Sequence, residues 1–496
     1  MFINPQQLTI KSAQQALAKK EFSCVELIQA IFKRIREHDG QVRAFLTLTE
    51  ERALEQAKET DRKIKKGEPL GPLEGIPVAV KDVICTQGVR TTAASKILAN
   101  YIPPYDATVV KKLKQAGAII VGKTNCDEFA HGASTENSAY GPSHNPWDLS
   151  RSPGGSSGGS AAALAAGFCL AALGTDTGGS TRQPAGWCNL YGLRPTYGRI
   201  SRFGLMAMTS STDTPGIFAK TAEDTALLLS ILAGHDSRDA TSLPSGVDDY
   251  ESKLSTSLQG LKIGLPKEFF SAESGSASGG HSFDSASREV IDQAINDLEK
   301  LGAIIKPVSL AHTKYAVPVY YIITPAEISS NLGRFDGIRY GYSSPEAENL
   351  VEVYTKSRGQ GFGPEAKRRI MLGAYTLSAG YYDAYNKKAQ KVRTIIADEV
   401  KKVLQEVDIL ATPVSPHPAI KLGEKVNDPL AMYQEDVFMD TAVMAGIPGL
   451  SIPVGFTDGL PVGLQLMGKQ LDEARLLSIA YQYEKEHEWV RKYPSF

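Results

Sequence analysis

The sequence has 496 residues and a formal net charge of −1, with 54 Lys and Arg against 55 Asp and Glu. This balance gives no electrostatic basis for a nucleic-acid-binding protein, and no apolar run approaches the roughly 18 residues of a membrane span. Five scattered cysteines without a CxxC pair favour reduced thiols, and the N-terminus lacks the pattern of a signal peptide. We therefore expect a cytoplasmic protein.

The N-terminal part is predicted to be helical. Ser23 and Glu26 form a capping-box pattern before a helix over 25–39, and a second helix is expected at about 49–66. The segment 75–82, GIPVAVKD, is apolar and β-branched, which indicates a buried strand that ends at Lys81. A helix at 107–116 and a strand at 118–121 would then complete a β–α–β order.

Residues 152–185 hold two clusters of glycine and serine, GGSSGGS at 154–160 and GTDTGGS at 174–180. The Ala-rich run from 161 to 173 between them predicts one buried helix that fixes the clusters relative to each other, and it argues against a flexible linker. Consecutive N–H groups in a Gly-rich turn form an anion-binding concavity. A serine hydroxyl beside such a turn, here that of Ser180, is typical of acyl transfer.

The rest of the chain alternates helices with short strands, which favours an α/β fold on a mixed sheet. The polar, low-complexity segment 271–287 is expected to be an exposed loop. The predicted elements are strands at 261–265, 303–309, 408–412, 449–455 and 462–467, and helices at 220–234, 287–301, 365–405 and 472–487.

Several motifs admit simpler interpretations. The segment 117–124 fits the P-loop expression, but a Lys-rich helix precedes it and its AIIV core is strand-like, so we expect no phosphate site there. GGSSG at 154–158 fits a nucleophile elbow without the strand that this motif requires, and its partners would have to be His417 or His487. His131 is more typical of a structural histidine, and no residues have metal-ligand spacing.

Lys81 is the best candidate for a general base. Desolvation at the end of an apolar strand disfavours the charged form of a lysine, and a neutral amine can accept a proton from a serine. A lysine that simply reaches solvent is the alternative.

Three segments, 75–82, 154–167 and 174–185, resemble the amidase signature family. The resemblance implies an α/β amidase signature fold, with a central mixed β-sheet flanked by helices on both faces. It also implies one domain over 1–496, whose parts are N-terminal helices (1–66), a catalytic core (67–215) and a remainder that carries substrate-recognition residues (216–496).

The same resemblance implies a Ser–Ser–Lys triad. Ser180 would be the acyl-forming nucleophile, Ser156 the bridging serine, held by a cis peptide, and Lys81 the base. The oxyanion would be bound by N–H groups of the nucleophile loop, at Thr177, Gly178, Gly179 and Ser180. Asp176 and Arg182 would brace this loop.

Within the family, the C-terminal half resembles the A subunits of tRNA-dependent amidotransferases, in segments 329–342, 365–393, 428–438 and 445–455. Arg369 would then bind the α-carboxylate of glutamine, with Arg368 as its rival, Asp436 would bind the α-ammonium group, and Tyr320 would lie alongside. Free glutamine is a zwitterion, so such a pocket needs one charge of each sign at its far end.

The implied activity is hydrolysis of glutamine and delivery of ammonia to a partner subunit, in a heterotrimer with B and C subunits. The partner would use ATP and magnesium to amidate misacylated Glu-tRNA(Gln) or Asp-tRNA(Asn), and this chain would hold no cofactor or metal. Lys123, Asp127 and Glu128 are polar candidates for the ammonia path. The alternatives are a stand-alone amidase for another small amide and an inactive scaffold subunit.

Overall fold

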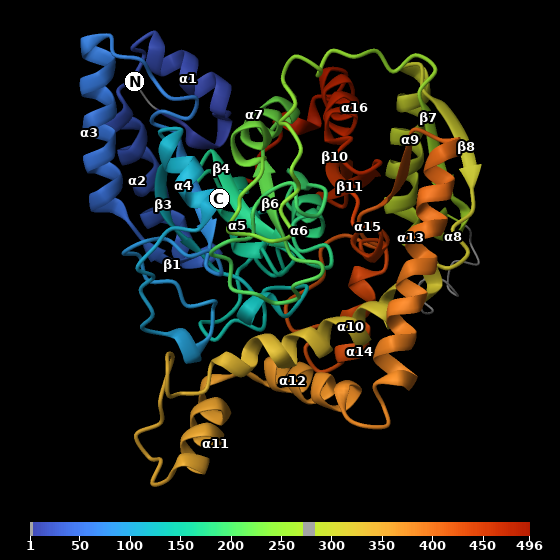
Figure 1. The fold of residues 1–496 in the computed structure, drawn as a ribbon. Helices are drawn as coiled ribbons and strands as arrows, with labels where there is room; N and C mark the ends of the chain where they lie inside the picture. Colours follow the sequence, from blue (N-terminus) through green and yellow to red (C-terminus); the bar gives the residue numbers. More distant parts are fainter. Residues whose placement is uncertain (1–2, 271–282) are drawn as a thin grey trace.

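The computed structural model describes residues 3–270 and 283–496 (Figure 1). Most of the predicted loop at 271–287 therefore lies outside the described residues. The strands are β1 Phe45–Leu48, β2 Pro77–Lys81, β3 Ile119–Thr124, β4 Ala171–Asp176, β5 Tyr191–Arg194, β6 Thr214–Ala219, β7 Lys262–Pro266, β8 Ile304–Val308, β9 Ile409–Pro413, β10 Gly449–Thr457 and β11 Leu460–Met467. The α-helices are α1 Ile10–Ala18, α2 Cys24–Val42, α3 Glu50–Lys66, α4 Thr108–Gln115, α5 Gly158–Ala165, α6 Arg182–Trp187, α7 Ala222–Leu232, α8 Lys267–Phe270, α9 Ser285–Lys300, α10 Ala316–Asn331, α11 Leu350–Gly361, α12 Pro364–Leu377, α13 Lys388–Glu406, α14 Pro429–Tyr433, α15 Asp440–Ala445 and α16 Glu473–Lys485.

One mixed sheet runs through the described chain. Its eleven strands follow the order β1-β3-β2-β4-β6-β5-β10-β11-β9-β7-β8. The pairs β2/β3, β2/β4, β7/β8 and β7/β9 are parallel, and the other neighbours are antiparallel. The prediction of an α/β fold on a mixed sheet flanked by helices is confirmed.

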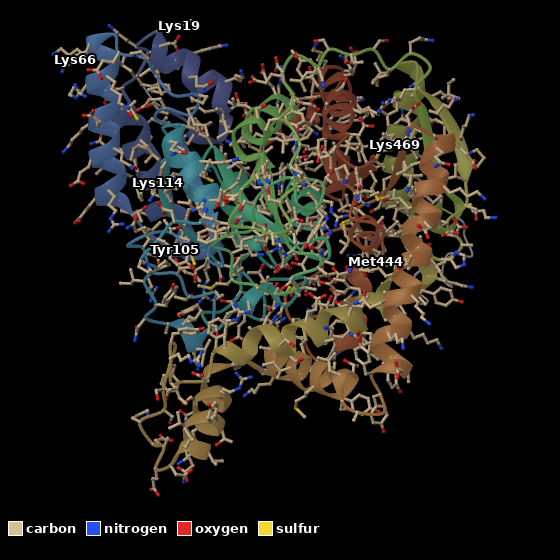
Figure 2. The ribbon with its side chains drawn as sticks, in the orientation of Figure 1. Lys19, Lys66, Tyr105, Lys114, Met444 and Lys469 are labelled. Atoms are coloured by element: carbon tan, nitrogen blue, oxygen red, sulfur yellow. The ribbon has the colours of Figure 1, made fainter. Side chains whose placement is uncertain are left out.

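Helices cover the sheet from both ends (Figure 1). The first three, α1 to α3, gather beside β1 and β3, whereas α9 and α13 lie beside β7 and β8. The predicted capping box at the start of α2 is present, because the Ser23 side chain accepts from the Glu26 N–H and the Glu26 side chain accepts from the Ser23 N–H. Lys19 and Lys66 extend outward at this end of the molecule (Figure 2).

The prediction of one helix over residues 161–173 is wrong. The helix α5 ends at Ala165, the chain turns at Gly167 with φ +74°, and β4 begins at Ala171, where it pairs with Val78 of β2. A continuous run of buried small apolar residues fits a helix and a central strand equally well, so periodicity could not separate the two.

The two longest helices that were not predicted are α10 and α11. Pro325 lies inside α10, and a proline argues against a helix interior in a sequence. Here α10 packs closely on α12, since a Cβ on Gly373 would lie 1.9 Å from the Pro325 carbonyl oxygen. The helices α10 and α12 form the lower layer in Figure 1, and they carry residues of the site described below.

No described helix is long and apolar enough to cross a bilayer.

A buried charge cluster joins the middle of the sheet to α6. Asp176, the last residue of β4, accepts from Arg182 Nε and Nη2 at 3.0 and 2.9 Å and from Arg194 Nη1 at 3.1 Å. All three side chains are fully buried. Burial alone would raise the pKa of Asp176, but the two guanidinium charges outweigh it and hold this pKa well below its usual value.

We expect Asp176→Asn to lower the free energy of unfolding by about 3–5 kcal/mol, because it leaves two buried guanidinium groups without their carboxylate. Urea unfolding should show a lower midpoint than the wild type at neutral pH. Since the pKa is depressed in the folded state, the difference should shrink as the pH falls and the wild-type carboxylate becomes protonated. Asp383→Asn, at an exposed ion pair, is the control and should leave the midpoint unchanged. Equal midpoints for both variants would contradict a stabilising role of the cluster.

Candidate active site

The Lys81 amine, at the end of β2, lies in a cage of hydroxyl groups. Its Nζ is 2.7 Å from Ser156 Oγ, 2.9 Å from Ser157 Oγ and 2.8 Å from Thr175 Oγ1. Each hydroxyl can donate or accept, so the cage suits either protonation state of the amine. Ser157 and Thr175 were not predicted, although both lie in the Gly/Ser clusters.

Burial decides the protonation state of Lys81. The residue is fully buried and no carboxylate of the described chain pairs with it, so desolvation lowers the pKa of Lys81 to about 8. About a tenth of the amine is therefore neutral at pH 7, far more than for an ordinary lysine, and the neutral form is the one that a general base requires. The alternative that Lys81 reaches solvent is excluded.

The peptide bond between Gly155 and Ser156 is cis, as the family resemblance implied. The Gly155 N–H donates to the Gln183 side-chain oxygen at 3.0 Å, and Gln183 Nε2 donates to the Ala133 carbonyl. Gln183 of α6 therefore ties the Ser156 loop to the segment around Ala133. Nothing in the sequence motifs pointed to this role.

The nucleophile candidate, Ser180, lies in the turn after β4. Its carbonyl accepts from the Ser157 N–H at 3.2 Å, which brings the two Gly/Ser clusters together. Ser180 is 7% exposed and Ser156 is fully buried, so a substrate can reach only the former. Within residues 3–270 and 283–496, no hydrogen bond joins the two side-chain hydroxyls. The structure thus contains the Lys81–Ser156 half of the predicted relay.

The nucleophile loop offers N–H groups to an anion. The Gly179 N–H already donates to Asp176 Oδ1 at 3.0 Å, while the N–H groups of Gly178 and Ser180 have no acceptor among the described residues. Gly178 faces Tyr320 so closely that a Cβ on it would lie 2.6 Å from the Tyr320 ring carbon Cζ. Asp176 and Arg182 hold this loop as expected, and Arg194 is a brace that was not predicted.

The predicted carboxylate-binding arginine is buried beside aromatic rings. The Arg369 side chain is 3% exposed, against 41% for its rival Arg368. The Arg369 guanidinium carbon lies 5.3 and 5.5 Å from the ring centres of Tyr321 and Tyr433, which stack at 3.9 Å. Its Nε donates to Glu365 at 2.7 Å, and no hydrogen bond from its two terminal nitrogens is formed within the described residues.

The predicted ammonium-binding carboxylate lies next to the same aromatic pair. Asp436 Oδ2 accepts from Tyr321 Oη at 2.8 Å, and burial raises the pKa of Asp436 to about 7. Tyr321 thus contacts both Arg369 and Asp436, and the neighbouring Tyr320 contacts the nucleophile loop. The sequence pointed to Tyr320 alone.

A pocket opens beside Arg369 and Tyr321. Its wall includes Ser134, Tyr321, Arg369, Lys425 and Tyr433. Ser134 also lies directly behind the cis peptide, because a Cβ on Gly155 would come within 2.4 Å of the Ser134 nitrogen. One wall of the pocket therefore packs against the loop that carries Ser156.

The histidine candidates form no hydrogen bond with Ser156 or Ser180 among the described residues. His417 contacts Glu435, and His487 contacts Asp297. His131 is buried with both ring nitrogens unpartnered among the described residues, and burial, with the nearby Arg369 charge, lowers its pKa well below the usual value. No described group of His, Cys, Asp or Glu could hold a metal ion.

The P-loop interpretation of 117–124 fails, because the strand β3 starts inside this segment and Lys123 is buried. Lys123 Nζ donates to the Ile84 carbonyl and to Thr91. Asp127 accepts two backbone N–H groups, and Glu128 accepts the Gly363 N–H. These three candidates for an ammonia path are thus polar and buried, and they are hydrogen-bonded to the surrounding chain.

Comparisons with known proteins identify the family of the chain. Residues 26–477 match the family described as Amidase. The chain is 54% identical to the A subunit of the glutamyl-tRNA(Gln) amidotransferase of Carboxydothermus hydrogenoformans, over 98% of this chain and 99% of that one. It is 52% identical to the protein of the same name in Pseudomonas fluorescens strain Pf-5, with the same coverage.

Solved structures include the A subunit of the glutamyl-tRNA(Gln) amidotransferase of Thermotoga maritima, with TM-score 0.81 and 41% identity over 100% of this chain and 98% of that chain. The peptide amidase of Stenotrophomonas maltophilia has TM-score 0.82 and 28% identity over 99% of both chains. The chain therefore belongs to the amidase family and, within it, to the group of glutamyl-tRNA(Gln) amidotransferase A subunits.

Proposed function

We propose that this chain hydrolyses glutamine as the A subunit of a tRNA-dependent amidotransferase. The observation that carries the proposal is a pair of oppositely charged side chains on Tyr321, of which Arg369 lines the pocket. Arg369 and Asp436 both contact Tyr321, and the pocket wall at Ser134 backs on to the loop of Ser156. This arrangement suits a free amino acid, whose α-carboxylate and α-ammonium groups need opposite charges.

In the proposed reaction, neutral Lys81 accepts a proton from Ser156, and Ser156 accepts one from Ser180. Ser180 Oγ attacks the side-chain amide carbon of glutamine. Turning the Ser180 hydroxyl toward Ser156 on substrate binding completes the relay, since catalytic hydrogen bonds often tighten only in the substrate complex. The N–H groups of Thr177, Gly178 and Ser180 stabilise the tetrahedral oxyanion, and Gly179 shares its N–H with Asp176.

Collapse of the tetrahedral intermediate breaks the C–N bond. The relay returns the proton to the leaving nitrogen, which departs as ammonia and leaves a glutamyl ester on Ser180. A water molecule then loses its proton to the relay and attacks this ester. Glutamate is released with Ser180 restored, so the net reaction consumes one glutamine and one water.

The ammonia would pass to a partner subunit. The proposal places this chain in a cytoplasmic heterotrimer with B and C subunits, in which the partner uses ATP and magnesium to amidate misacylated Glu-tRNA(Gln) or Asp-tRNA(Asn). The relatives' names, as subunits of a glutamyl-tRNA(Gln) amidotransferase, support this assignment. The five cysteines, all buried free thiols, are compatible with a reducing compartment.

Ser180→Ala and Lys81→Met should each lower glutamate formation from glutamine by at least about a thousandfold. Removing one member of a catalytic unit costs about as much activity as removing all of its members. His487→Gln, remote from the serine pair, should retain wild-type activity. A Lys81→Met enzyme with wild-type turnover would contradict the assigned base, and an inactive His487→Gln enzyme would favour a histidine-dependent hydrolase.

The pH profile should report the Lys81 amine. Because burial lowers the pKa of Lys81 to about 8, kcat/KM should rise as the pH passes through this value and the ammonium form loses its proton. Glutaramate, which lacks the α-ammonium group, is the substrate of choice because Asp436 titrates at about 7 and affects glutamine binding. A rate that is constant between pH 6 and 9 would contradict the assignment.

Ammonia transfer distinguishes the proposed amidotransferase component from a stand-alone amidase. Co-expression with candidate B and C subunits should yield a stable complex that forms Gln-tRNA from Glu-tRNA, glutamine and ATP. Glutaminase activity should be higher in that complex than in the isolated chain. A chain that stays monomeric in this co-expression and hydrolyses glutamine at full rate would favour the stand-alone amidase.

A further inference from the structure

Lys425 is a second, partly buried cation at the pocket of Arg369. It lies in the segment between β9 and α14, and both residues contribute to the wall of one pocket. Its side chain is only 12% exposed. Neither the family motifs nor the proposed mechanism gives it a role.

Two side chains hold the Lys425 ammonium group in place. It pairs with Glu435, whose side chain is 1% exposed, and its Nζ lies 3.3 Å from His417 Nε2. His417 Nε2 is in turn 3.1 Å from the same Glu435 oxygen. His417 Nε2 can either accept from Lys425 or donate to Glu435, but not both. An ammonium group has three donors, so at least one N–H is left for the pocket.

The carboxylate of Glu365 already partly neutralises the charge of Arg369. Glu365 accepts from Arg369 Nε at 2.7 Å, and it also accepts from Arg368 and from Tyr433. A ligand carboxylate has two oxygens and about four acceptor positions, and one edge of a guanidinium makes only two parallel hydrogen bonds to it. A second fixed cation on the same wall supplies the missing donor.

We propose that Lys425 binds the substrate carboxylate together with Arg369, and that Glu435 and His417 position it. The inference rests on the proposed function, since it concerns how the glutamine pocket selects an α-amino acid. Lys425 is then a specificity-determining residue: it acts on the substrate carboxylate, remote from the amide where Ser180 reacts.

The test compares two substrates in Lys425→Met. Glutamine carries the α-carboxylate, and 4-aminobutanamide is the same amide without it. We expect KM for glutamine to rise about tenfold or more, the size of one charge-assisted hydrogen bond, with kcat little changed. The kinetic constants for 4-aminobutanamide should equal those of the wild type, and Lys425→Arg should recover most of the glutamine affinity.

Lys421→Met is the matched control, because this lysine lies in the same segment with an exposed side chain that forms no hydrogen bond with the described residues. It should leave both substrates unaffected. If Lys425→Met impairs both substrates equally, or lowers kcat and thermal stability without changing the preference between them, Lys425 is structural and the inference is overturned. A wild-type chain without glutaminase activity, alone or in the complex, would instead overturn the proposed function.

Discussion

The active site depends on the burial of one carboxylate. Asp176 ends the central strand β4 and faces two buried guanidinium groups, from Arg182 on α6 and Arg194 on β5. The same carboxylate accepts the N–H groups of Gly179 and Thr181. One side chain thereby fixes the turn on both sides of Ser180 to the sheet. Breaking a buried ion pair leaves an uncompensated charge, so the turn is held strongly.

A second consequence of burial is the chemistry of Lys81. The same sheet that carries Asp176 brings this lysine to a site without a carboxylate partner, where hydroxyl groups are its only close polar contacts among the described residues. Desolvation therefore lowers its pKa, whereas the arginines around Asp176 keep that carboxylate ionised. At the ends of two neighbouring strands, the surroundings thus favour the neutral form of Lys81 and the charged form of Asp176.

The proposed glutamine-binding residues come from a different part of the chain. The helices α10 and α12 and the segment before α15 contribute Tyr321, Arg369 and Asp436, far in sequence from the serines. Tyr320 connects the two parts, because it packs on Gly178 in the nucleophile loop while its neighbour Tyr321 contacts the charge pair. In the proposed mechanism, the amide chemistry takes place at the sheet and the amino-acid end is bound by the helical layer beneath it (Figure 1).

The amino-acid sequence alone predicted the α/β class and pointed to Lys81 and Ser180, because these follow from local patterns of apolar and small residues. The family and the role of Ser156 came from the resemblance of three segments to known proteins. The local pattern misjudged residues 161–173, since small apolar residues suit a buried helix and a buried strand alike. Only the tertiary structure decided that Arg369 is buried rather than Arg368, that Arg194 and Gln183 brace the site, and that Tyr321 joins the two pocket charges. These contacts join residues that are distant in sequence, and burial, which sets the pKa of Lys81 and Asp436, is a property of the packed chain rather than of any local segment.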